Sequence, residues 1–282
     1  MGVSRDKSEI RKVPKTKEEI NAIIHISSTI DKNIQRLTIR DLKLGASGFN
    51  VDYGIYTQGV NTSEFRNLHI FQCKYGFYCS NESHGALWNL LFDNIEINSN
   101  TIRVYPKINH YGYKEGESCG VMCITNGGAG IQFNKCWVRD CGVGFNLKGI
   151  NYSQLNNCGA DNIHTTAYRI EYCSLSMNEC GMENVVTDCA IYLLQSNVSI
   201  QGLHDYKVMN RGKNKSYKIK VDGGNATLTN CILTPWEVNA SSSVFGVNAN
   251  YNARVTMINT YQPSNHNATE DSMNGATIKY VN

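Results

Sequence analysis

The chain has 282 residues, among them 24 glycines and 11 cysteines but only 4 prolines, and 10% of its residues are aromatic. This composition is rich in turn-forming residues yet keeps enough aliphatic and aromatic side chains for a core, which argues against a disordered chain. The 27 basic and 24 acidic residues give a net charge of +3, too small for a general attraction to nucleic acid or to an anionic membrane.

The first 22 residues are polar and lack the pattern described below, so we expect an N-terminal arm or cap over residues 1–22 and one domain over residues 23–282. The segment Thr16–Glu19 resembles a helix-capping box, which predicts a short helix over the open end of the fold. Alternatively, Ile24 and Ile26 belong to a first strand. No signal peptide opens the sequence, and no apolar run reaches the ~20 residues of a membrane span. We therefore expect no membrane insertion, and synthesis in a cytoplasm with reduced, buried cysteines.

A four-residue motif, Φ-x-x-Φ, recurs along the chain, where Φ is apolar and often cysteine at the second position. Successive copies lie 22 to 29 residues apart, except for one gap of 41 residues. The middle pair suits a sharp bend, as at Asn156-Asn157, because asparagine tolerates left-handed backbone angles. The nine copies begin at Ile39, Phe65, Phe92, Phe133, Leu155, Met177, Ile200, Leu228 and Met257.

A second motif, in which Gly or Ala precedes Φ-x-Φ, runs in step with the first. Its alternation is typical of a strand with two inward apolar side chains and one outward side chain. Copies begin at Gly54, Gly76, Gly120, Gly144, Ala167 and Ala190, with looser copies at Ser216, Val244 and Ala276.

Two motifs in step predict an all-β fold, a right-handed parallel β-helix with about nine or more coils, each made of strand, bend, strand, turn and strand. No single coil buries its apolar face, so stacking at strand spacing, about 4.8 Å, completes the core. A β-sandwich would not keep two motifs in step, and the leucine-rich repeat framework is absent. Two inward columns are expected: Phe133, Leu155, Met177, Ile200 and Leu228 in one, and Cys136, Cys158, Cys180, Leu203 and Cys231 in the next.

The 41-residue gap holds a polar, aromatic insertion around Tyr105–Tyr113. Insertions of this kind often carry function in solenoids, because they leave the repeating scaffold undisturbed.

The bends Asn156-Asn157-Cys158-Gly159 and Asn178-Glu179-Cys180-Gly181, with strands such as Gly144-Phe145-Asn146-Leu147, resemble bacteriophage tailspikes and tail appendages of the pectate-lyase-like β-helix superfamily. The resemblance covers about residues 23–282 and is one of architecture, since the Gly-Asp-Gly type of opening is missing. It implies a homotrimer in the phage tail that binds, and often cleaves, a host surface polysaccharide. Related β-helices include lyases, hydrolases and non-catalytic adhesins, so the fold does not give the activity.

Stacking converts sequence offsets into surface columns. Arg139, Asp161 and Glu183 each lie three positions after a cysteine of the inward column and should lie on consecutive coils. The two carboxyls would approach the roughly 5–5.5 Å separation of retaining glycosidases. The alternative is an exposed charge ladder without catalysis.

The outward column of the second motif offers another candidate site. Two carboxylates, Glu171 and Asp222, should lie two coils apart, about 9.6 Å at strand spacing and near the ~6.5–9.5 Å range of inverting enzymes. A lyase would instead use Arg169 or Lys218 as its base, and a merely polar outer face is the alternative. The substrate-binding candidates are Arg139, Asn146, Lys148, Arg169, Tyr192 and Lys218, because tyrosine stacks on sugar rings and cations pair with carboxylate or phosphate.

Three functions therefore stay open: a glycan-binding phage tail protein with or without depolymerase activity, a free-standing and then secreted polysaccharide lyase or glycoside hydrolase, and a structural β-helix segment. The seven histidines show no metal-ligand spacing, and no phosphate-binding loop or Gly-x-Ser-x-Gly elbow occurs. We expect no metal and no cofactor.

Overall fold

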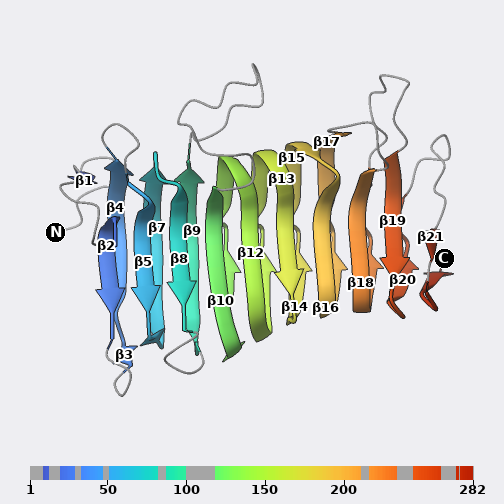
Figure 1. The fold of residues 1–282 in the computed structure, drawn as a ribbon, viewed down its shortest axis with the longest axis horizontal. Coiled ribbons are helices and arrows are strands. Elements are labelled where there is room, and N and C mark those ends of the chain that lie inside the picture. Colours follow the sequence, from blue (N-terminus) through green and yellow to red (C-terminus); the bar gives the residue numbers. More distant parts are fainter. Residues whose placement is uncertain are drawn as a thin grey trace.

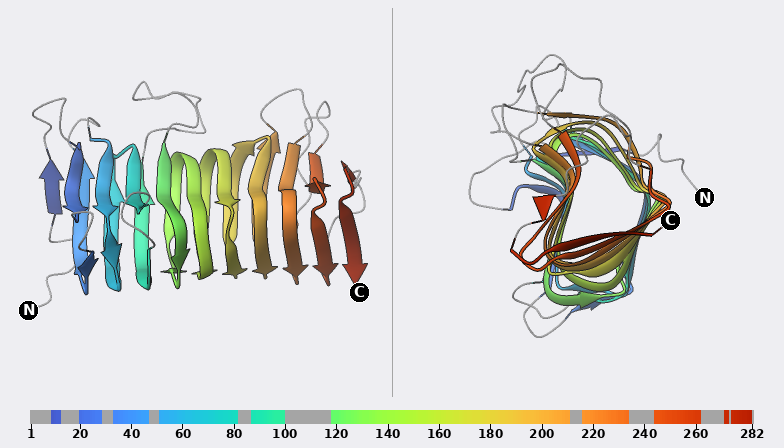
Figure 2. Two further views of the ribbon diagram at one scale, coloured as in Figure 1. Left: turned by 60° about the horizontal axis from the view of Figure 1, so that its bottom comes forward. Right: turned by 90° about the vertical axis from the view of Figure 1, so that its right-hand side faces the viewer.

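The computed structural model describes residues 9–12, 20–28, 33–46, 51–81, 87–99, 118–210, 216–233, 244–261, 271–272 and 274–281. All regular structure in these residues is β, and 20 strands form one parallel sheet that winds into a solenoid (Figure 1). Viewed down its long axis, the chain repeats nearly the same outline from coil to coil (Figure 2). The parallel β-helix predicted from the two motifs is confirmed.

The strands, in chain order, are β1 (Glu9–Lys12), β2 (Ala22–Ser27), β3 (Ile34–Gln35), β4 (Thr38–Ala46), β5 (Tyr53–Gln58), β6 (Val60–Asn61), β7 (Ser63–Phe71), β8 (Tyr75–Ser80), β9 (Leu90–Asn98), β10 (Cys119–Ala129), β11 (Gln132–Asn134), β12 (Trp137–Asn156), β13 (Gly159–Glu171), β14 (Ser174–Asn178), β15 (Gly181–Thr187), β16 (Cys189–Gln201), β17 (His204–Asn210), β18 (Ser216–Thr229), β19 (Val244–Asn250), β20 (Arg254–Ile258), β21 (Asp271–Ser272) and β22 (Thr277–Val281).

Each coil presents three faces, which one coil in the middle of the stack illustrates. Face 1 is β14, which ends on the first apolar residue of Φ-x-x-Φ, Met177, and the residue after it. Face 2 is β15, which follows the bend. Face 3 is the N-terminal half of β16 and carries the second motif, Ala190–Leu193, before β16 continues into face 1 of the next coil. The expected order of strand, bend, strand, turn and strand is therefore confirmed.

The bend between faces 1 and 2 has the same backbone conformation in all nine copies of Φ-x-x-Φ. The third residue of Φ-x-x-Φ is left-handed throughout, with φ from +45° at Asn259 to +63° at Gly202. Asn157, at φ +50°, is the residue for which the sequence predicted this conformation. Asparagine is common there because its side chain tolerates the left-handed region better than most residues do. The full set is Asp41, Asn67, Asn94, Lys135, Asn157, Glu179, Gly202, Asn230 and Asn259.

The core is a set of straight columns that run along the solenoid axis. Phe65, Phe92 and Phe133 stack ring on ring, with centroids 5.3 and 4.7 Å apart. The column continues through Leu155 and Met177, both fully buried, in the register that the motif predicts. Such contacts are repeated at strand spacing, so each coil supplies the surface that its neighbour needs to bury.

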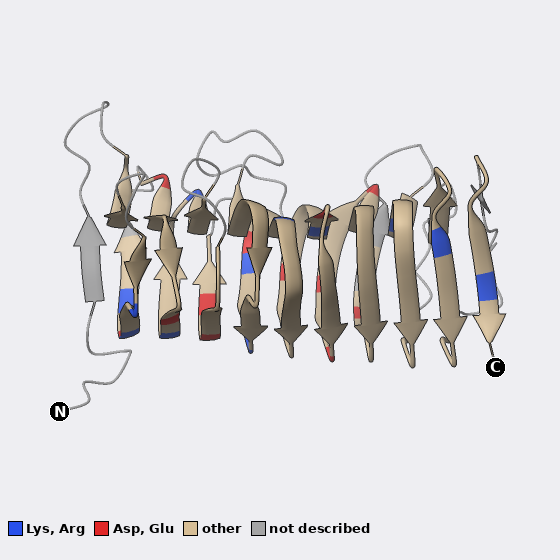
Figure 3. Ribbon diagram, turned by 90° about the horizontal axis from the view of Figure 1, so that it is seen from below, with Lys and Arg blue, Asp and Glu red and all other residues tan. Residues whose placement is uncertain are grey.

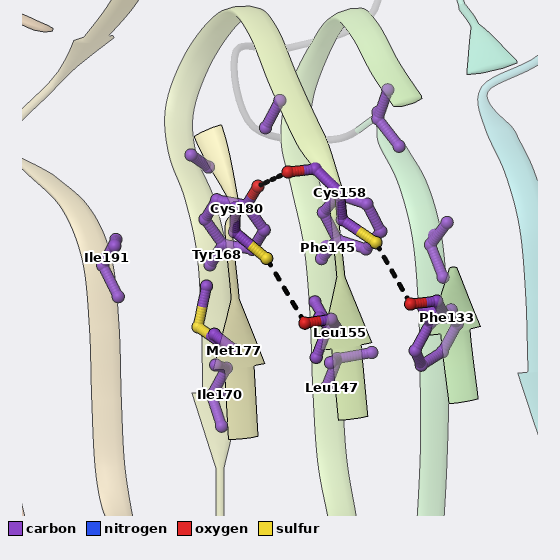
Figure 4. Close-up of a cluster of buried hydrophobic side chains, with 14 of the residues drawn as sticks. Phe133, Phe145, Leu147, Leu155, Cys158, Tyr168, Ile170, Met177, Cys180 and Ile191 are labelled. Atoms are coloured by element: carbon purple, nitrogen blue, oxygen red, sulfur yellow. Dashed lines mark hydrogen bonds between the residues drawn. The ribbon is translucent and has the colours of Figure 1, made fainter. Parts of the chain in front are cut away.

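All cysteines are free thiols, and all except the partly buried Cys189 are buried. Cys158 and Cys180 are each 1% exposed and lie on consecutive coils, where their thiols donate to the carbonyls of Phe133 and Leu155 (Figure 4). Burial raises the pKa of the Cys158 thiol well above its usual value. The expectation of buried, unbridged neighbours is confirmed.

The number of complete coils is smaller than expected. All nine Φ-x-x-Φ copies pair in register, and Tyr280 of β22 extends the column beyond Met257. However, the solenoid has about seven turns rather than nine or more. Beyond β17, face 2 continues as single bridges at Ile232 and Tyr261 in the described residues.

At the N-terminal end, Ile24 and Ile26 do belong to a strand, because β2 pairs with β5. β1 pairs with β4 in the same sheet. The capping helix expected near Thr16–Glu19 lies outside the described residues, and the division into an arm over residues 1–22 and a domain over 23–282 stays a prediction.

The three looser copies of the second motif were placed wrongly. Ile191 pairs with Ile219, and Ile219 with Val247, so the motif continues at Lys218 and Gly246, two residues later than predicted. The copy expected at Ala276 lies on face 1 instead, where β22 pairs with β20. Alternating strand patterns look alike after a shift of two residues, so sequence alternation alone could not fix this register.

Face 1 carries almost no charge over the middle of the solenoid (Figure 3). Its outward positions are amides and hydroxyls, and the amide of Asn178 donates to Asn156, which donates to Asn134. This asparagine ladder joins neighbouring coils at the surface, as the aromatic stack does inside.

Burying a carboxylate in the cysteine column is expected to destabilise the whole stack. Cys158→Asp should lower the free energy of unfolding by more than about 2 kcal/mol, because the new group has no charged partner there. Urea unfolding followed by circular dichroism measures the loss. Cys158→Ala is the control and should cost about 1 kcal/mol through lost packing alone. Equal losses in the two variants would contradict the buried position.

Candidate functional site

The outward positions of face 2 place charged and aromatic side chains in a column. Arg139 pairs in register with Asp161, Asp161 with Glu183, and Glu183 with Tyr206, so one side chain follows another on four consecutive coils. The predicted placement of Arg139, Asp161 and Glu183 is therefore confirmed, whereas their roles stay predictions. Parallel pairing in direct register produces the column, because it repeats each outward position on the next coil.

Among the described carboxyl groups, Asp161 stands out by its raised pKa. Burial raises the pKa of Asp161 from 3.8 to about 6. The indole Nε1 of Trp137 donates to its Oδ2 at 2.7 Å and opposes that rise, while the negative charge of Glu183 adds to it. A carboxyl with a pKa near 6 holds its proton at mildly acidic pH and can give it up near neutrality. A second carboxylate, that of Glu183, lies one coil away.

Arg139 is directed away from this pair. Its guanidinium forms an ion pair with Glu96 on the preceding coil. The Arg139 charge still lowers the pKa of Asp161, but less than the Trp137 hydrogen bond does. This end of the column therefore resembles an ordinary surface charge ladder, as the alternative interpretation held.

The sequence interpretation overlooked two aromatic residues of face 2. Trp137 is 43% exposed and Tyr206 is 65% exposed, and they lie on opposite sides of the acid pair Asp161–Glu183. The spacing of residues after the inward column could have located both Trp137 and Tyr206 from the sequence. Trp137 directly follows Cys136, and Tyr206 lies three positions after Leu203, the offset that located Asp161 and Glu183.

Face 3 carries the second candidate site. Asn146, Arg169 and Tyr192 follow one another in register, as predicted, and Lys148 pairs with Glu171. Tyr192 lies between two cations, with the Arg169 guanidinium 6.0 Å and the Lys220 ammonium 5.6 Å from its ring centroid. We name the set Arg169, Tyr192 and Lys220 the cation–tyrosine ladder. It presents one aromatic ring and two partly exposed cations on consecutive coils.

Lys218 does not belong to this ladder, contrary to the prediction. The two-residue shift of register puts Lys220 beside Tyr192. Lys218 is only 4% exposed and pairs with the buried Asp205 at 2.6 Å. Burial lowers the pKa of Lys218, and Asp205 partly restores it. A buried lysine held by a carboxylate cannot contact a polymer on the outer face.

The two carboxylates of face 3 are buried and form ion pairs and hydrogen bonds with residues of the ladder. Glu171 and Asp222 lie two coils apart, as expected, with Leu194 between them. Glu171 is 8% exposed and pairs with Arg169 at 2.6 Å. Asp222 is 5% exposed and accepts hydrogen bonds from Tyr192 at 3.0 Å and from the Asn250 amide at 2.9 Å. Lys220 also pairs with Asp222, at 3.0 Å. With their oxygens occupied in this way, the two carboxylates are better suited to orient the ladder than to transfer protons.

Four tyrosines extend face 3 toward the N-terminal end. Tyr53 stacks on Tyr75 and Tyr56 stacks on Tyr78, both at 5.1 Å, and rings of the two stacks meet edge to face. Burial, with the neighbouring phenols, raises the pKa of Tyr53 to about 12. Because these rings cover each other's faces, the cluster stabilises the stack of coils.

Comparisons with known proteins place the fold. The structure is similar to that of the gp42 tailspike of Acinetobacter phage vb_AbaP_AS12, with a TM-score of 0.68 and 11% sequence identity over 94% of this chain. The fold is a tailspike-like β-helix. The match covers 49% of the tailspike chain, so this chain spans about half of its length. No protein-family model and no curated protein matches the sequence.

Neither a metal-binding cluster nor a membrane-spanning helix occurs in the described residues. The described residues contain no group of three or more His, Cys, Asp or Glu side chains placed to hold a metal ion. They also contain no helix long and apolar enough to cross a membrane. The insertion around Tyr105–Tyr113 lies outside the residues that the structure describes.

The ionisation of Asp161 should be directly measurable. Carboxyl NMR titration is expected to give a pKa near 6 rather than 3.8, and Glu183→Gln should lower it because a like charge is removed. The folded state then holds this proton more tightly than the unfolded state. Its contribution is therefore a free energy of unfolding that is largest at low pH and falls as the pH rises from about 3.8 to above 6. Asp161→Asn should abolish that dependence, and an Asp161 pKa at or below 3.8 would refute the assignment.

Proposed function

We propose that the chain is part of a phage tail appendage that binds a polysaccharide on the host surface. The tailspike-like fold supports this, and so does a solenoid surface long enough to contact several units of a polymer. In this function the chain acts in the virion as a homotrimer, and a trimeric mass in solution would agree with it. A free-standing, secreted lyase or hydrolase is the alternative, as is a structural segment that binds nothing.

The cation–tyrosine ladder is the proposed binding surface, and the placement of Arg169, Tyr192 and Lys220 on three consecutive coils carries the proposal. Guanidinium and ammonium groups pair with carboxylate or phosphate, and the amide of Asn146 and the ammonium of Lys148 extend the surface by one coil. The buried Glu171 and Asp222 hold the cations in place while leaving them partly exposed. This surface suits an acidic, hydroxyl-rich polymer.

Cleavage is a second, separate proposal and is assigned to Asp161 and Glu183. The raised pKa of Asp161 supports it, with Asp161 as the general acid and Glu183 as the partner carboxylate one coil away. Strand spacing of about 4.8 Å places the pair near the separation of retaining glycosidases. Glu171 and Asp222 are the less suitable pair, because cations and hydrogen bonds occupy their oxygens.

Removing the ladder's ring or its charge should weaken glycan binding and leave the fold intact. Tyr192→Ala is expected to cost about tenfold in affinity for the isolated host polysaccharide, because an outward ring is lost and no cavity opens. Arg169→Ala should act in the same direction, and its effect should shrink at high salt, since its share is charge pairing. Biolayer interferometry measures both. Tyr152→Ala and Arg254→Ala, exposed residues outside the ladder, are controls and should bind like wild type.

If the acid pair is catalytic, Asp161→Asn and Glu183→Gln should each abolish release of oligosaccharides while polysaccharide binding remains. Activity of the wild type should fall as the pH rises through about 6, where Asp161 loses its proton. Product analysis by mass spectrometry distinguishes hydrolysis from elimination. If Glu171→Gln or Asp222→Asn removes activity instead, the catalytic face is face 3. If the wild type releases no product from a polysaccharide that it binds, the chain is a binding module.

A further inference from the structure

The indole of Trp137 lies over the neighbouring coil rather than projecting from its own. Trp137 and Gly159 are partners in register. A Cβ atom built on Gly159 would come within 2.5 to 2.7 Å of three atoms of the six-membered ring. Three nearly equal distances mean that the Cα of Gly159 faces the plane of the ring. Glycine at 159 therefore lets the indole lie against the strand and reach Asp161, while Trp137 stays 43% exposed.

The next coil offers bare backbone beside this ring. Gly181 pairs with Gly159, and a Cβ atom built there would meet only the carbonyl oxygen of His204, at 3.7 Å. Apart from the chain neighbours of Gly181, no other described atom lies within 4 Å of that Cβ position. Beyond it, the exposed Tyr206 is the partner of Glu183 on the following coil. Trp137 and Tyr206 belong to coils three steps apart, about 14 Å at strand spacing, and the acid pair lies between them.

This combination of groups matches a particular ligand chemistry. A pyranose ring presents a flat face of C–H groups that packs on an aromatic ring, and a rim of hydroxyls that carboxyl oxygens can bind. The patch contains Glu96, Asp161 and Glu183 against a single guanidinium, that of Arg139. An acidic sugar would be repelled here, whereas the cations that suit one lie on face 3.

We propose that Trp137 and Tyr206 are stacking positions for neutral pyranose rings on either side of Asp161 and Glu183. This proposal rests on the proposed function, since it gives the glycan a second contact surface on face 2. It also makes Trp137 a positioning residue, because its indole N–H holds the Asp161 carboxyl. A polymer that contains both neutral and acidic units would satisfy both faces.

The test uses the full chain and an array of neutral and uronate-containing oligosaccharides, followed by titration calorimetry with the best neutral probe. Trp137→Ala should weaken binding of that probe about tenfold, through loss of the stacking surface. Gly181→Val should weaken it similarly by occupying the bare backbone, since this position accepts a Cβ atom without a clash and is not left-handed. Trp88→Ala, which removes a tryptophan that is 49% exposed elsewhere, is the matched control and should bind like wild type. Thermal unfolding confirms that each variant is folded.

The outcomes separate this proposal from the proposed function. If Trp137→Ala and Gly181→Val bind the neutral probe as tightly as wild type while Tyr192→Ala weakens polysaccharide binding, the face 2 proposal is wrong and the proposed function stands. If the wild type binds uronate-containing probes but no neutral probe, the face 2 proposal is likewise wrong and the proposed function stands. A wild-type chain that binds neither the array nor the host polysaccharide overturns both.

A second readout isolates the positioning role. Trp137→Phe keeps an aromatic ring but removes the indole N–H, which lowers the pKa of Asp161 in the wild type. The variant should therefore show a higher Asp161 pKa by carboxyl NMR and keep most of its affinity for the neutral probe. An unchanged Asp161 pKa would show that the hydrogen bond does not position the carboxyl.

Discussion

Parallel pairing in direct register is the constraint on which the rest of this structure depends. Strands are hydrogen-bonded to the equivalent strands of the next coil, so most of their side chains lie beside a counterpart one coil away. Inside, this favours columns of like groups, such as stacked phenylalanines and buried thiols. Outside, it turns a short sequence offset into a line of neighbouring groups. Both candidate sites are such lines.

The same constraint explains what the sequence could predict. Φ-x-x-Φ straddles a bend that needs a left-handed residue, so it was recognisable in all nine copies and its register was predicted correctly. Strand alternation has no such marker. A shift of two residues preserves the pattern, which is why Lys218 was placed outside although it is buried against Asp205. The acid pair followed from a constant offset after the inward column. The position of Trp137 directly after Cys136 was equally readable, but its contact with the next coil depends on the missing side chain at Gly159.

The three faces differ in how their charges are balanced. On face 3 Glu171 pairs with Arg169 and Asp222 pairs with Lys220, so the charge that remains partly exposed is positive. Around the acid pair of face 2, the carboxyls of Glu96, Asp161 and Glu183 outnumber the guanidinium of Arg139, and burial leaves Asp161 with a pKa of about 6. Face 1 has amides and hydroxyls over the middle of the solenoid. One repeating scaffold thus presents a cationic, an acidic and a neutral surface.

The alternation of inward and outward positions within Ala190–Leu193 has a consequence for how such a protein changes over time. Ile191 and Leu193 are fully buried, whereas Tyr192 between them contributes little to the core. Substitutions at outward positions away from such buried features usually alter stability by less than about 0.5 kcal/mol. Selection can therefore change the outward side chains one coil at a time without compensating changes inside. In the proposed function, this separation would let the recognised polysaccharide change while the architecture persists.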